Sequence, residues 1–314
     1  MRAWLRYAFA SSSFLHLFII KNIMFVREQF EFIHTVWDTT FQKINMEIQA
    51  TIVKALREAG QILQSAFGTI EKTLDKQDQS NIVTEADIAS EKKIIEVLEK
   101  DYPEYSILAE ESGYINKGSL YTWIIDPLDG TSNFASRIPW YGVIITLLKN
   151  NCPVETGILL PYFDEMYLAS EGRGATLNGK PIHVCNEVSM KKILFSYCLD
   201  YSEIPGKTAF ESRIIKELVQ NIRNLRSTNS VTDFCYVADG RLGGCINQTT
   251  KAWDIAGPLL LLKEAGAKVT DIDGKEILFN LSCQNYLDNY TIVCAPENIH
   301  QQVMPLIEKC KAEV

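Results

Sequence analysis

One stretch of the chain, Trp123–Phe134, reads W-I-I-D-P-L-D-G-T-S-N-F and constrains the fold more than any other. Its apolar, β-prone start, Trp123–Ile125, predicts a strand that stops at Asp126-Pro127, and Asp129-Gly130 is a second turn signal. The tight turn that proline and glycine permit would bring both carboxylates to one side. The amides of 130–132 would face an anion if a helix begins there. Asp-Pro and Asp-Gly are also ordinary turn dipeptides, so this stretch alone leaves a plain acidic turn open.

The composition favours one or two globular domains with a sizeable core, because 46% of the 314 residues are apolar and 22% are charged. The formal net charge of −8 argues against a general nucleic-acid binder and against a binder of anionic membranes. The eight cysteines form no C-x-x-C pair, and we interpret them as reduced core residues of an intracellular protein without a zinc site. The four histidines are scattered, which disfavours a histidine-bound metal or a Ser-His-Asp triad.

Residues 1–45 do not match the sequence that follows them. Two arginines precede a mostly apolar stretch, Tyr7–Ile20, in the outline of a signal peptide or a short membrane anchor. That stretch is short for a full membrane span and is broken by serines. We favour a third interpretation, in which translation starts at Met24 or Met46, because a clean amphipathic helix begins at Met46. The expected domain therefore covers residues 46–314.

Helical and strand-like patterns alternate along the rest of the chain, with many hairpin signals between them. Helices are expected from Met46 to Gly68, from about Asp87 to Lys100, and over 207–223, 231–238, 254–265 and 298–310. Strands are expected over 106–109, 123–125, 142–148, 153–160, 165–170, 225–227, 243–246, 267–270 and 291–294. This mixed order predicts an α/β (α+β) fold built as a layered sandwich.

Carboxylates recur at strand ends or helix starts in four separated places. They are Asp87, Glu110 with Glu111, Asp126 with Asp129, and Asp254. Alone, an acid in the first turn of a helix only complements the helix dipole, and two adjacent carboxylates repel unless they are exposed or share a cation. Together, the four places predict a Mg²⁺ site, since this ion prefers oxygen ligands and is usually completed by phosphate and water. Two such ions close together can activate water and neutralise a leaving oxygen.

Four motifs resemble those of the inositol monophosphatase family. The stretch Asp126–Phe134 is similar to its D-P-[IL]-D-G-T-x-N-F signature, and Trp253-Asp254 with Glu264–Gly266 is similar to its W-D-x-A-[AG]…E-A-G signature. Ala109–Ser112 resembles its G/A-E-E-S motif, and Val83–Asp87 its V-T-x-[AT]-D motif. Chance does not account for all four, because they occur in the family order at similar spacing.

The resemblance implies an α/β/α/β/α sandwich, usually dimeric, with Mg²⁺-dependent phosphatase activity that Li⁺ inhibits in many members. It also implies two to three Mg²⁺ ions per site. Glu110, Asp126 and the carbonyl of Leu128 would hold the tightest ion. Asp126, Asp129 and Asp254 would hold a second ion, and Glu110 and Asp87 would lie near a third, weaker one.

Catalytic and substrate-binding roles follow from the same resemblance. Thr131 and Asp87 would orient and deprotonate the attacking water, and Glu111 would support them from nearby. Gly130, Thr131 and Ser132 would grip the phosphate at a helix start, and Asp254 would lie against the substrate.

Two positions depart from the family pattern. Members that bind inositol diols usually carry a glutamate about seven residues before W-D, whereas the matching place here holds Asn247 or Gln248, depending on a one-residue gap. In addition, Pro258 follows Asp254 by four residues. It would remove a hydrogen bond from a helix that starts at Asp254, but would be an ordinary first-turn proline if the helix starts near Gly257.

These features predict a cytoplasmic, Mg²⁺-dependent hydrolase of a small phosphorylated metabolite, acting as a homodimer. No nucleic-acid partner is expected, and no membrane unless residues 1–45 are a true anchor. The substrate could be an inositol phosphate, histidinol phosphate, fructose bisphosphate or a 3′-phosphonucleotide, because one fold hosts all of these activities. The alternative is a non-catalytic regulatory or RNA-associated protein of the same fold. The complete ligand set and the acidic charge speak against that alternative.

Overall fold

The computed structural model describes residues 46–69, 74–75, 82–282 and 284–312. The extension predicted at residues 1–45 lies outside these ranges. Residues 49–314 form one unit, and the fold below is the fold of that unit. The first described helix covers residues 46–66, and Gly68 follows it with a positive φ of 81°, as the periodicity predicted. Within the described ranges, each helix is too short or too polar to cross a membrane.

The larger sheet has eight strands in the order β10-β9-β8-β7-β6-β5-β3-β4. These strands are β3 (Ser106–Ala109), β4 (Gly113–Ile115), β5 (Tyr121–Asp129), β6 (Gly142–Lys149), β7 (Cys152–Leu160), β8 (Glu165–Ser170), β9 (Gly174–Leu177) and β10 (Lys180–Ile182). Neighbours pair antiparallel, except that β3 and β5 run parallel. A separate short pair joins β1 (Leu74–Asp75) to β2 (Ile82–Val83). The parallel pair matters for function, because both of its strands end at the same edge.

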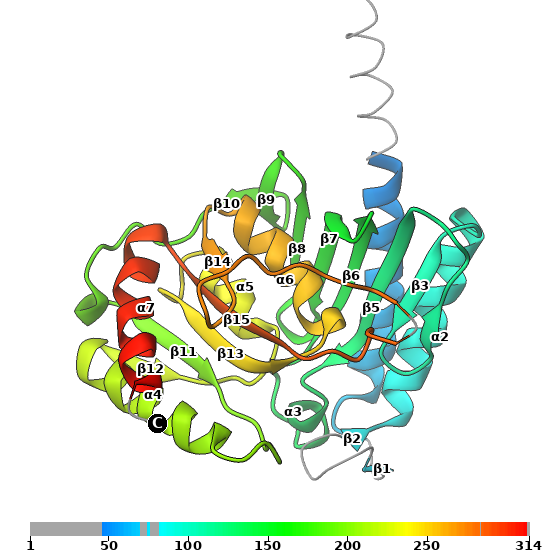
Figure 1. Ribbon diagram of the computed structural model, residues 1–314. Helices are drawn as coiled ribbons and strands as arrows, with labels where there is room; N and C mark the ends of the chain where they lie inside the picture. Colours follow the sequence, from blue (N-terminus) through cyan, green and yellow to red (C-terminus); the bar gives the residue numbers. More distant parts are fainter. Residues whose placement is uncertain (1–45, 70–73, 76–81, 283, 313–314) are drawn as a thin grey trace, which may run out of the picture. The chain divides into compact units, whose positions relative to one another are not determined.

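Helices cover both faces of the larger sheet. The helix of residues 46–66 and α2 (Glu85–Asp101) pack on one face, and α6 (Ala252–Glu264) packs on the other (Figure 1). Gly157 in β7 allows the close approach of the first helix, since a Cβ there would lie 2.5 Å from the side chain of Ile52 and 2.7 Å from that of Leu56. Gly257 in α6 meets the opposite face in the same way, 2.6 Å from the side chain of Ile144.

The smaller sheet has five strands in the order β12-β11-β13-β15-β14. They are β11 (Leu194–Cys198), β12 (Asn224–Arg226), β13 (Cys245–Thr250), β14 (Lys268–Thr270) and β15 (Tyr290–Ala295). One face packs with α5 (Thr232–Ala238) and α6, and the other with α4 (Lys207–Asn221) and α7 (Glu297–Lys311) (Figure 1). Two short 3-10 helices, η1 (Pro161–Phe163) and η2 (Met190–Lys192), complete the connections. The layers are thus helix, sheet, helix, sheet, helix, which confirms the predicted sandwich.

The structure differs from the sequence analysis at two strand ends, adds one strand, and decides between the two helix starts that were left open around Pro258. Strand β5 does not stop at Asp126-Pro127 but runs on to Asp129. Strand β11 lies in a stretch where no strand was predicted, and β13 begins at Cys245 rather than at Gly243. Helix α6 begins at Ala252, so Pro258 lies inside it, and the alternative start near Gly257 is excluded. The ring of Pro258 therefore opposes the carbonyl of Asp254, in the first turn, where α6 meets the site.

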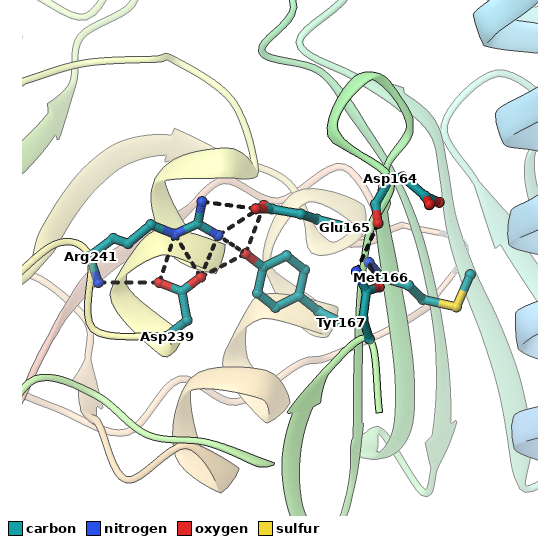
Figure 2. Close-up of polar contacts among 7 residues, drawn as sticks. Asp164, Glu165, Met166, Tyr167, Asp239 and Arg241 are labelled. Atoms are coloured by element: carbon teal, nitrogen blue, oxygen red, sulfur yellow. Dashed lines mark hydrogen bonds and ion pairs between the residues drawn. The ribbon is translucent and has the colours of Figure 1, made fainter. Parts of the chain in front are cut away.

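An arginine cluster ties the larger sheet to the turn after α5. The guanidinium of Arg241 binds Asp239, with Nε 2.8 Å from Oδ2, and Glu165 at the start of β8, with Nη2 2.8 Å from Oε2 (Figure 2). It also donates to the hydroxyl of Tyr167 and lies over the ring of Tyr236, 3.7 Å from its centroid. Because the carboxylate of Asp239 is only 6% exposed, its charge needs this partner.

Candidate active site

A β-bulge at the end of β5 places two carboxylates on the same side. Asp126 pairs with Ile144 and Asp129 pairs with Gly142, so two residues of β5 oppose only one of β6. In a regular strand, residues three apart face opposite sides of the sheet, and the extra residue of a bulge corrects this. A bulge also tolerates Pro127, which lacks an amide hydrogen. This is why the strand continues past a dipeptide that usually ends one.

The parallel register of β3 and β5 brings Glu110 beside Asp126. Ala109 pairs with Ile125, and the amide of Glu110 continues the ladder by donating to the carbonyl of Ile125 at 3.2 Å. The next residue of each strand is an acid. Their proximity is also electrostatic, because the charge of Glu110 raises the pKa of Asp126 and of Asp129.

Asp254 lies beside Asp126 and Asp129 but comes from helix α6 rather than from the larger sheet. It lies in the first turn of α6, where its Oδ2 accepts a hydrogen bond of 2.6 Å from the amide of Lys251. Carboxylate oxygens of Asp126, Asp129 and Asp254 all lie within 4.8 Å of one another. Three acids that are far apart in the sequence therefore form one cluster.

The negative charges of the cluster repel one another as long as no cation balances them. Burial raises the pKa of Asp126 well above its usual range, and the charges of Glu110, Asp129 and Asp254 raise it further. Burial likewise raises the pKa of Asp129 and of Asp254 to about 7. A bound cation would relieve both the mutual repulsion and the cost of burying negative charge. Oxygen donors of this kind and density suit Mg²⁺, so the residues present fit the ion that the sequence predicted.

A hydroxyl–carboxylate pair lies next to the cluster. The hydroxyl of Thr131 is 3.1 Å from Oδ1 of Asp87 and 2.9 Å from the carbonyl oxygen of Leu128. Asp87 is fully buried at the start of α2, and its Oδ2 accepts hydrogen bonds from the amide and hydroxyl of Thr84, at 2.8 and 2.5 Å. Burial raises the pKa of Asp87, and the nearby charge of Glu111 adds to the rise. The helix-capping role of Asp87 thus coexists with a contact to Thr131.

Gly130 makes the sharp turn between β5 and α3 (Thr131–Ala135). Its φ is +81°, and a Cβ at this position would lie 2.7 Å from the carbonyl oxygen of Trp140. Only glycine combines that backbone conformation with that approach. Thr131 and Ser132 therefore open a short helix directly after Asp129, as predicted.

Asp233, which the sequence did not single out, holds a loop against the cluster. Its buried carboxylate accepts hydrogen bonds from the amide of Thr228, the amide of Asn229 and the hydroxyl of Ser196, at 3.0, 3.1 and 2.7 Å. The amide of Val231, at the end of this loop, donates to Oδ1 of Asp129. In the sequence, Asp233 is a single acid within a predicted apolar helix, and no motif marks it as a site residue.

The two candidate positions in β13 face opposite sides. Gln248 is 5% exposed, and its Nε2 donates to the hydroxyl of Tyr197 at 2.5 Å, in the layer that packs against α4 and α7. Asn247 alternates with it and shares the face of Cys245, toward α5 and α6. The structure therefore turns Gln248 away from the acidic cluster, contrary to one of the two predicted alternatives.

A further acid was missed in the sequence. Asp200 accepts a hydrogen bond from Nδ2 of Asn229 at 2.5 Å, and its charge raises the pKa of Asp129 and Asp254.

Comparison with known proteins gives the same family as the motifs. The model of the inositol monophosphatase family matches residues 45–312. A fructose-1,6-bisphosphatase/inositol-1-monophosphatase of Aquifex aeolicus is 34% identical over 67% of this chain and 80% of its own length. A putative Nus factor SuhB of Neisseria meningitidis serogroup B is 33% identical over 82% of this chain and 96% of its own. The crystal structure of the extragenic suppressor protein SuhB from Bartonella henselae superposes with a TM-score of 0.76, at 27% identity, covering 84% of this chain and 99% of that one.

These matches place the chain among the phosphoric monoester hydrolases. More narrowly, it belongs to the inositol monophosphatase family, whose model covers most of its length. The family that the sequence resembled is therefore confirmed, and the layered fold is that of a similar solved structure.

Proposed function

We propose that this protein hydrolyses a small phosphate monoester in a Mg²⁺-dependent reaction. The observation that carries the proposal is the cluster of Asp126, Asp129 and Asp254, with oxygens within 4.8 Å, beside the contact between Thr131 and Asp87. The cluster offers oxygen ligands at high density, with Asp126 buried and Asp129 and Asp254 half-buried, and the adjacent pair can bind a water and take its proton. Together they supply the groups that metal-assisted hydrolysis needs.

The metal ligands in this proposal are those of the sequence analysis. Glu110, Asp126 and the Leu128 carbonyl would hold one ion, and Asp126, Asp129 and Asp254 a second, with Glu110 and Asp87 near a third. When bound, Mg²⁺ supplies positive charge that stabilises the charge developing on the phosphoryl oxygens and makes water more acidic.

The protein's own groups position the water and move its proton. The hydroxyl of Thr131 can accept a hydrogen bond from the attacking water while it donates to Asp87. As the water attacks phosphorus, its proton passes to the Thr131 oxygen while the Thr131 hydroxyl proton passes to Asp87, and the alcohol that leaves takes up a proton from solvent. Burial, which raises the pKa of the Asp87 carboxyl, makes it a better base for this step. Glu111 acts through its charge on Asp87. Gly130, Thr131 and Ser132 hold the phosphate at the start of α3, where Gly130 allows close backbone approach.

Asn247 and Asp254 would contact the leaving group, on the side of the cluster where Asp200 lies. We do not assign Gln248 to the substrate, because its side chain is buried against Tyr197. An amide at position 247 offers an NH₂ donor group as well as an acceptor oxygen, where a carboxylate would offer acceptors alone. Weak selectivity for inositol 1-phosphate over other small phosphates is therefore the expected consequence.

Phosphate release across a panel of esters, with and without Mg²⁺, tests the proposal. The panel contains myo-inositol 1-phosphate, fructose 1,6-bisphosphate, histidinol phosphate and a 3′-phosphonucleotide. We expect turnover of at least one ester that requires Mg²⁺. No turnover of any member at any Mg²⁺ concentration would contradict the proposal.

A second candidate is a regulatory role in RNA-associated assemblies, since several similar proteins are named Nus factors or putative Nus factors. The net charge of −8 favours the enzyme over direct RNA binding. A homodimer and Li⁺ inhibition are further proposals that come from the family resemblance, and a cytoplasmic location is one that comes from the cysteines, which form no C-x-x-C pair.

A further inference from the structure

The first two turns of α2 carry a buried polar face. Asp87, Ser90 and Glu91 are 0%, 0% and 3% exposed, and they lie one helical turn apart or side by side. Each contacts a different segment of the candidate site. The contact of Asp87 with Thr131 is part of the proposed reaction, whereas those of Ser90 and Glu91 have no role in it so far.

Ser90 holds the β5 bulge. Its hydroxyl donates to the carbonyl oxygen of Pro127 at 2.8 Å, and this contact is fully buried. Pro127 lies between Asp126 and Leu128, whose carboxylate and carbonyl are proposed ligands of one ion. A peptide inside a bulge lacks its regular ladder partners, so this hydrogen bond satisfies a carbonyl that would otherwise be buried alone.

Glu91 holds the acidic turn after β3. Its Oε2 accepts a hydrogen bond of 2.8 Å from the amide of Glu111, and its other oxygen accepts one from the hydroxyl of Ser112. Burial raises the pKa of Glu91, and the two hydrogen bonds oppose that rise. Burying a carboxylate costs free energy. Here the buried carboxylate of Glu91 fixes the peptide that joins Glu110 to Glu111. The direction of the Glu110 side chain depends on that peptide.

We infer that Ser90 and Glu91 are positioning residues that set the geometry of the Mg²⁺ ligands on β3 and β5. The inference depends on the proposed function, because it assumes the proposed ligand set. Helix α2 would then fix the separation of Glu110, Asp126 and Leu128, which come from the ends of two different strands. Groups that orient metal ligands typically change metal affinity ten- to a hundredfold when they are removed, roughly speaking.

The test compares Mg²⁺ binding by titration calorimetry, without substrate, in wild type and four variants. Ser90→Ala and Glu91→Ala remove the contacts, whereas Glu91→Gln keeps an acceptor for the amide of Glu111. Lys92→Ala is the control, because Lys92 is exposed on the same helix. We expect Glu91→Ala to weaken Mg²⁺ binding about tenfold, Ser90→Ala to weaken it less, Glu91→Gln to recover much of the loss, and Lys92→Ala to match wild type.

Thermal melts in EDTA separate positioning from simple destabilisation. The inference would be overturned if Ser90→Ala and Glu91→Ala both lowered the melting temperature but bound Mg²⁺ as tightly as the Lys92→Ala control. Equal weakening in Glu91→Ala and Glu91→Gln, with Ser90→Ala unchanged, would also overturn it, since charge and not position would then matter. If Glu91→Ala does not fold, Ser90→Ala and Glu91→Gln decide by the same criterion. Failure of wild type to bind Mg²⁺ would instead contradict the proposed function.

Discussion

At the scale of single residues, burial decides the chemistry of the candidate site. Asp129 and Asp254, whose pKa values are raised to about 7 by burial, would be charged or neutral depending on modest changes in pH. The same carboxylates on an exposed surface would be ionised at any physiological pH. The sequence identified these acids and their order, but their proximity depends on contacts between β5 and α6 that no local pattern encodes.

A pH dependence of stability follows from these raised pKa values. Because their pKa values are higher in the folded than in the unfolded state, the folded protein binds more protons between about pH 4 and pH 7. Without metal, the free energy of unfolding should therefore fall as pH rises through this window. Mg²⁺ competes with those protons, so the rise in melting temperature caused by Mg²⁺ should be larger at pH 8 than at pH 5.5. Melts in EDTA and in Mg²⁺ across this range provide the check, and an equal Mg²⁺ effect at both pH values would contradict the account.

At the scale of elements, amphipathic helices were predictable and irregular strands were not. The C-terminal end of the helix of 46–66 and both ends of helix α7 were predicted from apolar periodicity to within two residues. Strand β11 was missed because its five residues have no polar–apolar alternation, being packed on both faces. The end of β5 was misplaced because Asp-Pro normally ends a strand, and a bulge is decided by the pairing partner β6.

The link between β8 and the turn after α5 makes a prediction at this scale. Arg241→Ala would leave the carboxylates of Asp239 and Glu165 without their shared cation, so we expect a loss of roughly 1.5–3 kcal/mol in the free energy of unfolding. Lys263→Ala is a matched control, since it removes an exposed ion pair with Glu276 of 3.4 Å and should cost at most about 1 kcal/mol. Urea denaturation measures both. Equal, small losses would show that the arginine cluster does not stabilise the fold.

At the scale of the whole molecule, the candidate site joins the two sheets through one inner helix. Asp126 and Asp129 come from the larger sheet, and Asp254 lies in the first turn of α6, which packs between the sheets. The layered architecture was predictable from element order and from the family resemblance. The positions of Asp233, Asp200 and Glu91 around the acids were not, because each reaches the site only through tertiary contacts.

Deletion of residues 1–45 should leave a folded and active enzyme. The family model begins at residue 45, and every residue assigned to the candidate site lies at Asp87 or beyond. Expression of residues 46–314 beside the full chain, with circular dichroism and phosphate release as readouts, tests this. An insoluble or inactive product would show that the extension is needed, and the start-site interpretation would then be wrong.

Asp126→Asn is the sharpest test of the proposed metal site, because Asp126 is the one acid assigned to both principal ions. The amide keeps the shape of the side chain but weakens a shared ligand, and it removes one of the repelling charges. Initial rates of phosphate release at saturating Mg²⁺, together with thermal melts in EDTA, are measured on wild type and variant. Turnover should be abolished while the melting temperature in EDTA is unchanged or higher. Substantial residual turnover in a folded variant would contradict it.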